Sequence, residues 1–508
     1  MKSGLKFHAA LFVLFTFIIF VFCHPAIAEQ TGQDSEIEDF TEDSSDDLGS
    51  DFEDDSDADS GDALGDDFDD GESGEDLEVF EEEVAYEEPS PVAINGHFVI
   101  ESSYNYAHKE PAQGATDWRG LSKLRSEFQL EVDAKLSESW QMFISGDYFY
   151  DFAYSINGRD NYTQEVLDDY EQWAQLRKAY IQGSLLKSLD IKFGRQIIVW
   201  GRSDNMRVTD VLNPLELREP GLTDIEDLRL PVAMTRLDYY YGDWNIMGVA
   251  VHEQRSNQNP AYGSDFYPLP LVYGPLSEEK PSSEIENTGF AVAVNGNFSG
   301  WDVSFYYADL YSHEAHVELS PTPVFPPVMV FLFSPKPVFH YADITMAGTA
   351  FNVTTGNWLF KAEAAYFTGI RFSDMTGSGN TGNYSRVDTL AGIEYLGFTD
   401  TTLNIDALNS HYTDFDDAAD LMGAEENSFQ TAVRISRDFF NETLNLMFLA
   451  SVYGNGDDGA LFRLTAEYDV TDNIEIIGGG VNYKSGDRPE FENIGDNDRV
   501  YLNVKYSF

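Results

Sequence analysis

The chain has 508 residues, a formal net charge of −58, a mean hydropathy of −0.33 and one cysteine, Cys23. After residue 28 no apolar run is long enough for a transmembrane helix. The lack of any further cysteine excludes disulfides, thiolate zinc sites and cysteine catalysis in the rest of the chain. We expect no cofactor and no nucleic-acid partner.

Residues 1–28 are predicted to be a signal peptide. Lys2 and Lys6 give a positive start, residues 9–23 are apolar, and Ala26-Ile27-Ala28 offers small residues for cleavage. A transmembrane anchor is the alternative, but the apolar stretch is shorter than the roughly 20 residues that span a bilayer. Phe22 stands where a lipoprotein signal needs a small residue, so we expect no lipidation at Cys23.

Residues 29–91 are predicted to be a disordered acidic periplasmic segment. Residues 29–88 contain 29 Asp or Glu, and no Lys or Arg follows the signal until Lys109. Such a segment cannot bury enough apolar surface to offset its chain entropy. Alternate aspartates at 55–59 resemble calcium ligands, but Ser60 stands where an EF-hand loop needs glycine. We expect loose binding of divalent cations, or of a basic periplasmic partner, and no formed metal site.

Residues 92–508 alternate between segments of period-two patterning and turn-rich connections. In residues 461–470, Phe462, Leu464 and Ala466 share one face, while Arg463 and Glu467 occupy the other. A soluble antiparallel sheet also alternates, but the number of segments favours an all-β, antiparallel, up-and-down transmembrane barrel of about 18 strands (16–18). The strands are predicted to begin near Ile94, Leu121, Trp140, Trp173, Leu189, Pro231, Asp243, Thr288, Gly300, Phe339, Gly356, Tyr384, Thr401, Asn427, Thr443, Asp458, Asn473 and Arg499.

The connections alternate in length as those of an outer-membrane barrel do. Long connections are expected at 253–287, 311–337 and 372–383, among others. After Pro91, prolines fall in the long connections, except Pro231, which is placed first in a strand because proline cannot donate to a sheet ladder. An even strand number puts both barrel ends on the periplasmic side. Short turns are expected near Ser137, Lys187, Gly242, Ser299, Thr355, Thr399, Asn441 and Asp472.

The final strand, residues 499–508, alternates in polarity and ends on an aromatic residue. Its outer face carries Tyr506 and Phe508. This ending resembles the C-terminal signal by which barrel proteins are recognised for insertion. The resemblance implies the outer membrane of a Gram-negative bacterium, with membrane lipid and the insertion machinery as partners. A homo-oligomer is left open.

If the apolar faces meet lipid, the polar faces line the lumen. Any one charged wall residue could simply be paired with a neighbour, but together they would be costly in a dry core. A wide, hydrated interior is therefore predicted, for which 16–18 strands leave room. The predicted wall residues are Glu127, Glu131, Asp133, Arg236, Asp238, Lys361, Glu363, Asp388, Glu394, Arg463 and Glu467.

The third long connection, between the strands near Leu189 and Pro231, is rich in opposite charges. In porins the loop at this place folds into the barrel and narrows the pore. A salt-bridged knot that only holds the loop and a constriction that selects solutes are both compatible with the pattern. The predicted constriction residues are Arg202, Asp204, Arg207, Asp210, Asn213, Arg218, Glu219, Asp227 and Arg229.

Several short segments here resemble an uncharacterised family of proteobacterial outer-membrane barrels. They are Gly194-Arg195-Gln196, Trp200-Gly201, Asp210–Pro214 and the approach to Pro231, and the resemblance spans residues 193–241. Members are often encoded near transporters or genes for handling hydrophobic compounds. The resemblance thus implies an outer-membrane location and leaves open an uptake or export channel for hydrophobic or amphiphilic compounds.

The expected function is a porin-like channel for passive diffusion of small solutes. Beyond the acidic segment the chain has 60 acidic and 29 basic residues, which favours cations. A structural or adhesive barrel is a further alternative. An enzyme is not expected, because His313-Glu314-Ala315-His316, placed in an exposed loop, falls short of a zinc-protease motif. The acidic segment also cannot form the folded plug of a TonB-dependent receptor.

Overall fold

The computed structural model describes residues 91–111, 115–223, 227–268, 274–319, 337–373, 381–488, 490–492 and 494–508. The predicted signal peptide and, apart from Pro91, the predicted acidic segment lie outside the described residues.

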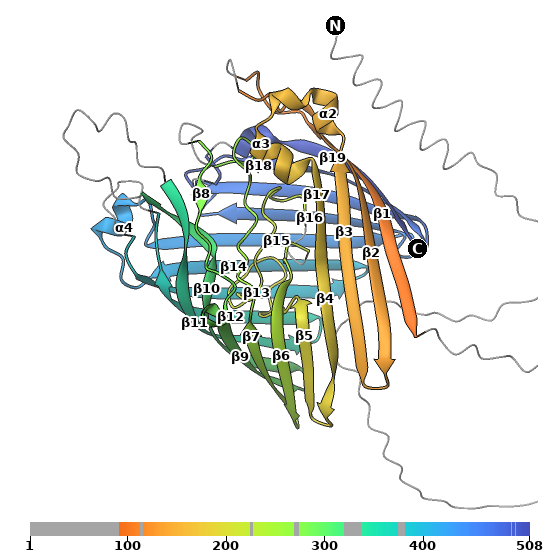
Figure 1. Ribbon diagram of the computed structural model, residues 1–508, viewed down its shortest axis with the longest axis vertical. Helices are drawn as coiled ribbons and strands as arrows, with labels where there is room; N and C mark the ends of the chain where they lie inside the picture. Colours follow the sequence, from red (N-terminus) through yellow and green to blue (C-terminus); the bar gives the residue numbers. More distant parts are fainter. Residues whose placement is uncertain are drawn as a thin grey trace, which may run out of the picture. The chain divides into compact units, whose positions relative to one another are not determined.

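Eighteen antiparallel strands pair in sequence order, and the last pairs with the first, so that the sheet closes into a barrel (Figure 1). Each begins within two residues of its predicted start, which confirms the predicted barrel. The strands are β1 (Val92–Asn105), β2 (Gly120–Ser137), β3 (Trp140–Asp151), β4 (Gln172–Leu186), β5 (Leu189–Gln196), β6 (Val232–Tyr241), β7 (Trp244–Val251), β9 (Gly289–Phe298), β10 (Trp301–Leu319), β11 (Pro337–Thr355), β12 (Trp358–Ile370), β13 (Tyr384–Phe398), β14 (Thr401–Tyr412), β15 (Asn427–Phe439), β16 (Leu444–Tyr453), β17 (Gly459–Thr471), β18 (Ile474–Lys484) and β19 (Arg499–Ser507).

Short turns join the strands at one rim and long connections join them at the other. Seven of the short turns have two residues, and the turn between β15 and β16 has four. All eight lie at or next to their predicted positions. The long side carries a two-residue strand, β8 (Ser277–Glu278), which pairs in parallel with β11. Short helices also lie on that side: α2 (Ala153–Asn157), η1 (Arg159–Asn161), α3 (Gln164–Tyr170), η3 (Ile285–Asn287), α4 (Asp417–Leu421) and η5 (Ile494–Asn497).

The structure corrects three predictions about where the connections and their prolines lie. Residues 311–319 were expected in a long connection, but they continue β10, and Ala315 to Leu319 pair with Tyr341 to Pro337 of β11. Pro337 is therefore the first residue of a strand, a position where its missing N–H is tolerated. Pro231 lies one residue before β6 instead of within it.

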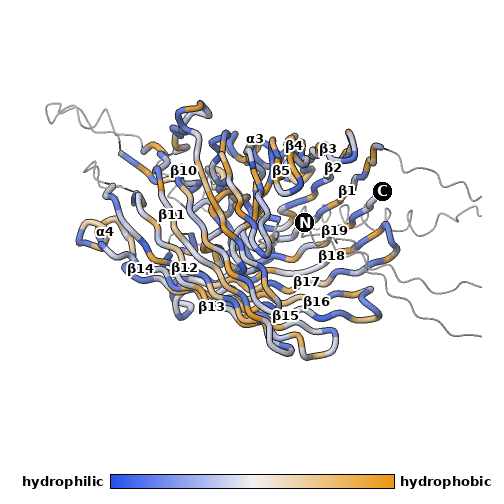
Figure 2. The backbone as a smooth tube through the Cα atoms, turned by 90° about the horizontal axis from the view of Figure 1, so that it is seen from below, coloured by the Kyte–Doolittle hydropathy of each residue, from blue (hydrophilic) through white to orange (hydrophobic). Residues whose placement is uncertain are grey.

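Hydrophobic and hydrophilic residues alternate along the strands (Figure 2), and the two faces of the barrel differ accordingly. On β17 the side chains of Leu464 and Tyr468 are 59% and 45% exposed, whereas Arg463 and Thr465 are buried inside. Large apolar side chains face outward on strands around the whole barrel. No helix among the described residues is long and apolar enough to span a membrane.

Aromatic rings gather beside the short turns. Across β7, β9 and β10, Trp244 meets the ring of Phe298 edge to face with centroids 5.5 Å apart, and Phe298 stacks on Trp301 with centroids 4.3 Å apart. Trp358 of β12 lies 4.4 Å from the ring of Tyr395 on β13. Aromatic residues at this level are typical of the membrane interface. A closed barrel with an apolar outer band and an aromatic girdle is an outer-membrane architecture.

The last residue completes the barrel. Phe508 exchanges two backbone hydrogen bonds of 3.0 Å with Gly96 of β1. A side chain at position 96 would collide with the Phe508 ring, because a Cβ there would lie 2.7 Å from its Cζ. That ring also stacks on Phe128 and Tyr506, with centroids 6.2 and 6.3 Å apart. The predicted role of Tyr506 and Phe508 as an insertion signal stays a prediction.

Replacing Leu464 by arginine tests the assignment of the outer face. A charge facing lipid near the middle of β17 should lower the free energy of unfolding by about 2–4 kcal/mol. Denaturant titration in lipid vesicles measures this. Ser451→Arg on the inner face of β16 is the control and should change the free energy by less than about 1 kcal/mol. Equal losses in both variants would contradict the assignment.

Candidate functional site inside the barrel

The connection between β5 and β6, residues 197–223 and 227–231 in the described chain, is here called loop 3. It folds into the barrel and runs across its interior (Figure 1). Side chains or backbone of loop 3 contact the inner wall at β2, β10, β12, β14, β17 and β18. The loop therefore reaches the wall opposite the strands from which it starts.

Glu363 on β12 docks the first turn of loop 3. Its Oε1 accepts hydrogen bonds from the backbone N–H groups of Arg202 (2.6 Å) and Ser203 (3.0 Å). Its Oε2 accepts from Thr209, at 2.9 Å from the hydroxyl and 3.3 Å from the N–H. The backbone comes this close because Gly201 has a φ of +89° and no Cβ, which would lie 2.9 Å from Glu363. One carboxylate thus holds two separate parts of the loop.

Further polar contacts hold the same turn. Lys361 binds Asp204 of loop 3 at 2.6 Å and Glu394 of the wall at 3.0 Å. Asp406 on β14 accepts hydrogen bonds from Ser203 Oγ at 2.8 Å and from Asn205 Nδ2 at 2.9 Å. The guanidinium of Arg202 pairs with Asp302 of β10 at 2.6 Å. The turn is therefore tied to three strands.

A buried knot closes the base of the loop. Asn213 is fully buried: its Oδ1 accepts from Ile198 N–H, and its Nδ2 donates to the carbonyls of Gln196 and Leu230. Asp210 pairs with Arg229 at 2.7 Å and with Arg207 at 3.0 Å. These bonds join the entry and exit of loop 3. The side chains at the base of loop 3 therefore form a salt-bridged knot, one of the two arrangements that the charge pattern allowed.

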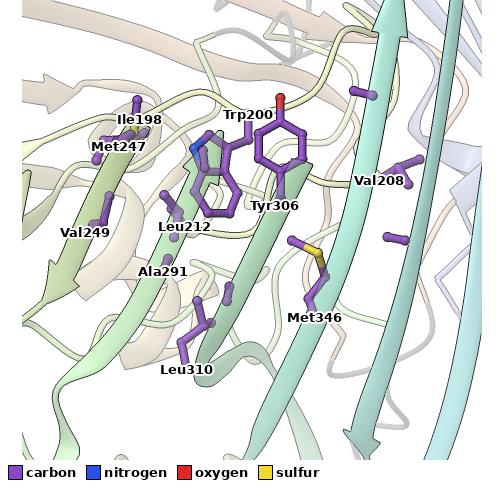
Figure 3. Packing of buried hydrophobic residues seen from close by; sticks show 14 of the residues in the cluster. Ile198, Trp200, Val208, Leu212, Met247, Val249, Ala291, Tyr306, Leu310 and Met346 are labelled. Carbon is purple, nitrogen blue, oxygen red and sulfur yellow. The ribbon is translucent and has the colours of Figure 1, made fainter. Parts of the chain in front are cut away.

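Apolar side chains fasten the loop to one half of the inner wall (Figure 3). The ring of Trp200 stacks on Tyr306 of β10, with centroids 4.8 Å apart. Leu212 is fully buried, and Met206 and Val208 pack in the same cluster with inward-facing residues of β6, β7, β9, β10 and β11. The sequence predicted that polar faces line a wide, hydrated lumen, and the apolar inner surface on this half of the wall differs from that prediction. Small and apolar inward residues on these strands make the wall a docking face.

The far end of loop 3 reaches the opposite, polar wall. Glu219 binds Lys123 of β2 at 2.6 Å and lies 3.8 Å from Arg125. Tyr483 of β18 donates a 2.6 Å hydrogen bond to the carbonyl of Pro220. Arg463 of β17 donates to the carbonyl of Gly221 at 3.4 Å. Arg218 is held within the loop by Glu216 and donates to the carbonyl of Asp169.

The predicted constriction residues separate into groups. Arg202, Asp204 and Glu219 bind the wall, and Arg218 binds the connection between β3 and β4. Arg207, Asp210, Asn213 and Arg229 form the knot, and Asp227 is exposed. Sequence reasoning placed all nine in one functional set because it gives their spacing but not the direction of each side chain.

All eleven predicted wall residues lie on inward-facing positions, and none is exposed. Lys361, Glu363 and Arg463 contact loop 3. Others form pairs along the wall, such as Arg236 with Asp238 at 2.6 Å. Glu131 and Asp133 accept instead from neutral amides, those of Gln129 and Gln141. The remaining members of the set are Glu127, Asp388, Glu394 and Glu467.

A second crossing segment was not predicted. The connection between β7 and β9, described at residues 252–268 and 274–288 and here called loop 4, also enters the barrel. Asp265 pairs with Arg499 of β19 at 2.7 Å, and Phe266 packs against Tyr483 of β18. Gln258 bonds the backbone of Leu215 in loop 3. The sequence signal for this crossing was weak, because Asp265 and Phe266 carry no pattern that points to a partner more than 200 residues away.

The histidine cluster lies on a strand, which corrects its predicted place in an exposed loop. His313 belongs to β10, and its ring bonds the carbonyls of Arg255 and Val211 at 2.8 and 3.1 Å. His316 is buried and faces Glu318 at 3.1 Å. Within the described ranges no three His, Cys, Asp or Glu side chains come together as a metal site.

Comparison with known proteins gives a family match and a fold likeness. The family model described as "Protein of unknown function (DUF1302)" matches residues 102–508. No curated protein matches the chain in sequence. Solved structures similar to the chain include a BenF-like porin from Pseudomonas fluorescens Pf-5, with a TM-score of 0.48 and 11% identity over 82% of this chain and 98% of that one. OccAB1 of Acinetobacter baumannii has a TM-score of 0.47 and 10% identity, with 82% and 96% covered.

Asn213→Ala tests the knot. The substitution leaves the N–H of Ile198 and two buried carbonyls without their partner, and each such group costs about 1–3 kcal/mol. We therefore expect a loss of stability and faster proteolysis within loop 3, measured by denaturant unfolding and by timed protease digestion of the folded barrel. Asp227→Ala, at an exposed position of the same loop, is the control. Unchanged protease sensitivity of Asn213→Ala would contradict the knot's role.

Proposed function

The chain belongs to the DUF1302 family, and on this barrel scaffold we propose that it is an outer-membrane channel for passive diffusion of small solutes, with loop 3 as its constriction. The family carries no assigned activity, so the proposal rests on the barrel. An 18-stranded closed barrel encloses a lumen. One observation carries the proposal: a long loop crosses that lumen and is docked by side chains on six strands.

The docking is specific, which supports a fixed constriction over a loop that merely fills space. Glu363 and Asp406 are buried beneath the loop, and four hydrogen bonds to Glu363 and two to Asp406 come from loop 3. The apolar side of the loop completes the inner wall near Trp200 and Leu212. Wall and loop are thus complementary in both charge and shape.

The segments that resemble the outer-membrane family lie at the docking points. Gln196 bonds the carbonyl of Met234 at 3.1 Å, Trp200 stacks on Tyr306, and Asn213 closes the loop base. We propose that these segments place the loop.

The channel is proposed to prefer cations. Eight of the eleven predicted wall residues are acidic. Glu131 and Asp133, toward the short-turn rim, accept hydrogen bonds from the neutral amides of Gln129 and Gln141. Asp238 and Asp388 are paired with Arg236 and Arg386, so the proposed preference rests on wall acids such as Glu131 and Asp133.

A channel for hydrophobic or amphiphilic compounds is the second candidate. It would need an apolar inner surface open to the solute, and the apolar wall from β6 to β11 is covered by loop 3. A structural or adhesive barrel would act through the acidic segment, with divalent cations or a basic periplasmic partner. That segment lies outside the described residues, so this alternative stays a prediction.

Glu363→Ala is the direct test of the constriction. Removal of the carboxylate leaves the donors of Arg202, Ser203 and Thr209 without an acceptor, so the first turn of loop 3 should leave its position. We expect a higher single-channel conductance in planar bilayers than for the wild type. Glu394→Ala is the matched control, because Glu394 bonds Lys361 and leaves the contacts of Glu363 in place. Equal conductance in wild type and Glu363→Ala would refute the constriction.

The proposed selectivity is tested by neutralising two acidic residues of the inner wall near the short-turn rim. Glu131→Gln combined with Asp133→Asn should move the reversal potential in a salt gradient away from the cation side, most strongly at low salt, where charges are least screened. The control is Asp227→Asn, which removes a charge from an exposed position. A wild-type reversal potential that indicates anion preference would overturn the proposed selectivity.

A further inference from the structure

The two crossing loops end in short tips that meet the same wall. The tip of loop 3 is residues 219–223, and the tip of loop 4 is residues 263–267. Leu222 and Phe266 pack in one apolar cluster with Leu461, Val481 and Tyr483 of β17 and β18. The two tips therefore share a single contact surface on the far wall.

Behind the tips both loops are fastened to other elements. Arg218 is held by Glu216 at 2.7 Å and by the carbonyl of Asp169, and Tyr170 at the end of α3 donates to the carbonyl of Arg218 at 3.1 Å. In loop 4, Ala261 is buried against α3. The Tyr262 carbonyl accepts from Thr163 at 2.7 Å. The backbone N–H of Gln258 in loop 4 donates to the carbonyl of Leu215 in loop 3 and so joins the two loops. These attachments fix the points from which the tips extend.

Ion pairs hold both tips to the wall. Glu219 of loop 3 binds Lys123 on β2, and Asp265 of loop 4 binds Arg499 on β19. β1 lies between β2 and β19 and pairs with both. Tyr483, Arg463 and Asn497 add hydrogen bonds to backbone carbonyls of the tips. The tips are thus attached mainly through charge and polar contacts, whereas the base of loop 3 is attached through a buried knot and a large apolar cluster.

Basic residues of the wall keep Glu219 ionised. Burial alone would raise the pKa of Glu219, but Lys123 and Arg125 hold it at about 2, and Arg499 acts in the same direction. Glu101 also lies 3.5 Å from Lys123 and 3.7 Å from Arg125. The wall can therefore redistribute its pairing when Glu219 leaves, which lowers the cost of releasing the tip.

A partly open pocket lies directly beside the tip of loop 3. Its volume is about 40 Å³, and it is bordered by Leu222 and Thr223 on the loop side and by wall residues Glu101, Lys123 and Tyr501. The tip therefore packs on its β17–β18 side and borders this pocket on its β1–β2 side.

We propose that residues 219–223 and 263–267 form a two-part gate, which closes on the Glu219–Lys123 and Asp265–Arg499 pairs and opens by release of both tips while the loop bases stay docked. The inference rests on the proposed channel function and adds to it a moving part. Because the tips share one apolar contact, release of one weakens the hold on the other. The constriction at Glu363 and the gate at the far wall are then separate devices on the same loop.

A disulfide across the loop 3 tip tests the movement. The Cβ of a residue at position 221 would lie 3.1 Å from Leu461 Cγ, close to where a cysteine sulfur at 461 would sit. In the double variant Gly221→Cys/Leu461→Cys, we expect oxidation to abolish transitions between conductance levels and reduction to restore them. The two single-cysteine variants, treated identically, are the controls. Identical single-channel records for the verified disulfide and its reduced form would overturn the gate.

Neutralising the acidic residue of each tip tests the role of the two ion pairs. In Glu219→Gln/Asp265→Asn we expect the ratio of open to closed time to rise by a factor of about ten or more, which corresponds to 1.4 kcal/mol. Asp227→Asn removes the same charge from an exposed position of loop 3 and should leave the ratio unchanged. Folding of every variant is checked by heat-modifiable electrophoretic mobility. A ratio unchanged in the double variant, or changed equally in Asp227→Asn, contradicts the role of these ion pairs. Absence of conductance in the folded wild type would instead refute the channel itself.

Discussion

Backbone pairing in a membrane is the constraint on which this structure depends. Lipid offers no partner for an unpaired N–H or C=O group, so a spanning sheet must close on itself. The pairing of β19 with β1, completed by Phe508 and Gly96, satisfies this condition. Closure turns one face of every strand toward lipid and the other toward an interior that the chain must fill or leave to water. The polar residues and the long loops consequently meet inside the barrel.

The interior is divided between two kinds of surface. From β6 to β11 the part of the inner wall that faces loop 3 is largely apolar, and the loop lies on it through Trp200, Leu212 and their neighbours. The wall at β1, β2 and β19 is charged, and the loop tips meet it through Glu219 and Asp265. Firm apolar docking at one end and ionic contacts at the other give the crossing loops a fixed base and releasable tips. The same asymmetry separates a static constriction from a movable gate.

The strands could be predicted because their signals are local. Alternation as in residues 461–470 and short turns such as Gly242-Asp243 depend on neighbouring residues, and each predicted strand start lies within two residues of the structure. The inward direction of Glu363 followed from the same alternation, but its four bonds to loop 3 did not, because they join residues more than 150 positions apart. The crossing of loop 4 and the strand position of His313 were missed for a similar reason: both depend on pairing beyond the membrane-spanning part, which period-two patterning does not reveal.

The central claim is that loop 3 lies in the conduction path. Cys23, the one cysteine of the chain, falls in the predicted signal peptide, so a single cysteine at position 204 can be modified selectively. Asp204 lies on the inner turn of loop 3, and its side chain is 45% exposed. Attachment of a bulky thiol reagent to Asp204→Cys should reduce the single-channel current in a discrete step, while the same reagent on outward-facing Tyr241→Cys should not. An unchanged current after verified modification at position 204 would contradict the account.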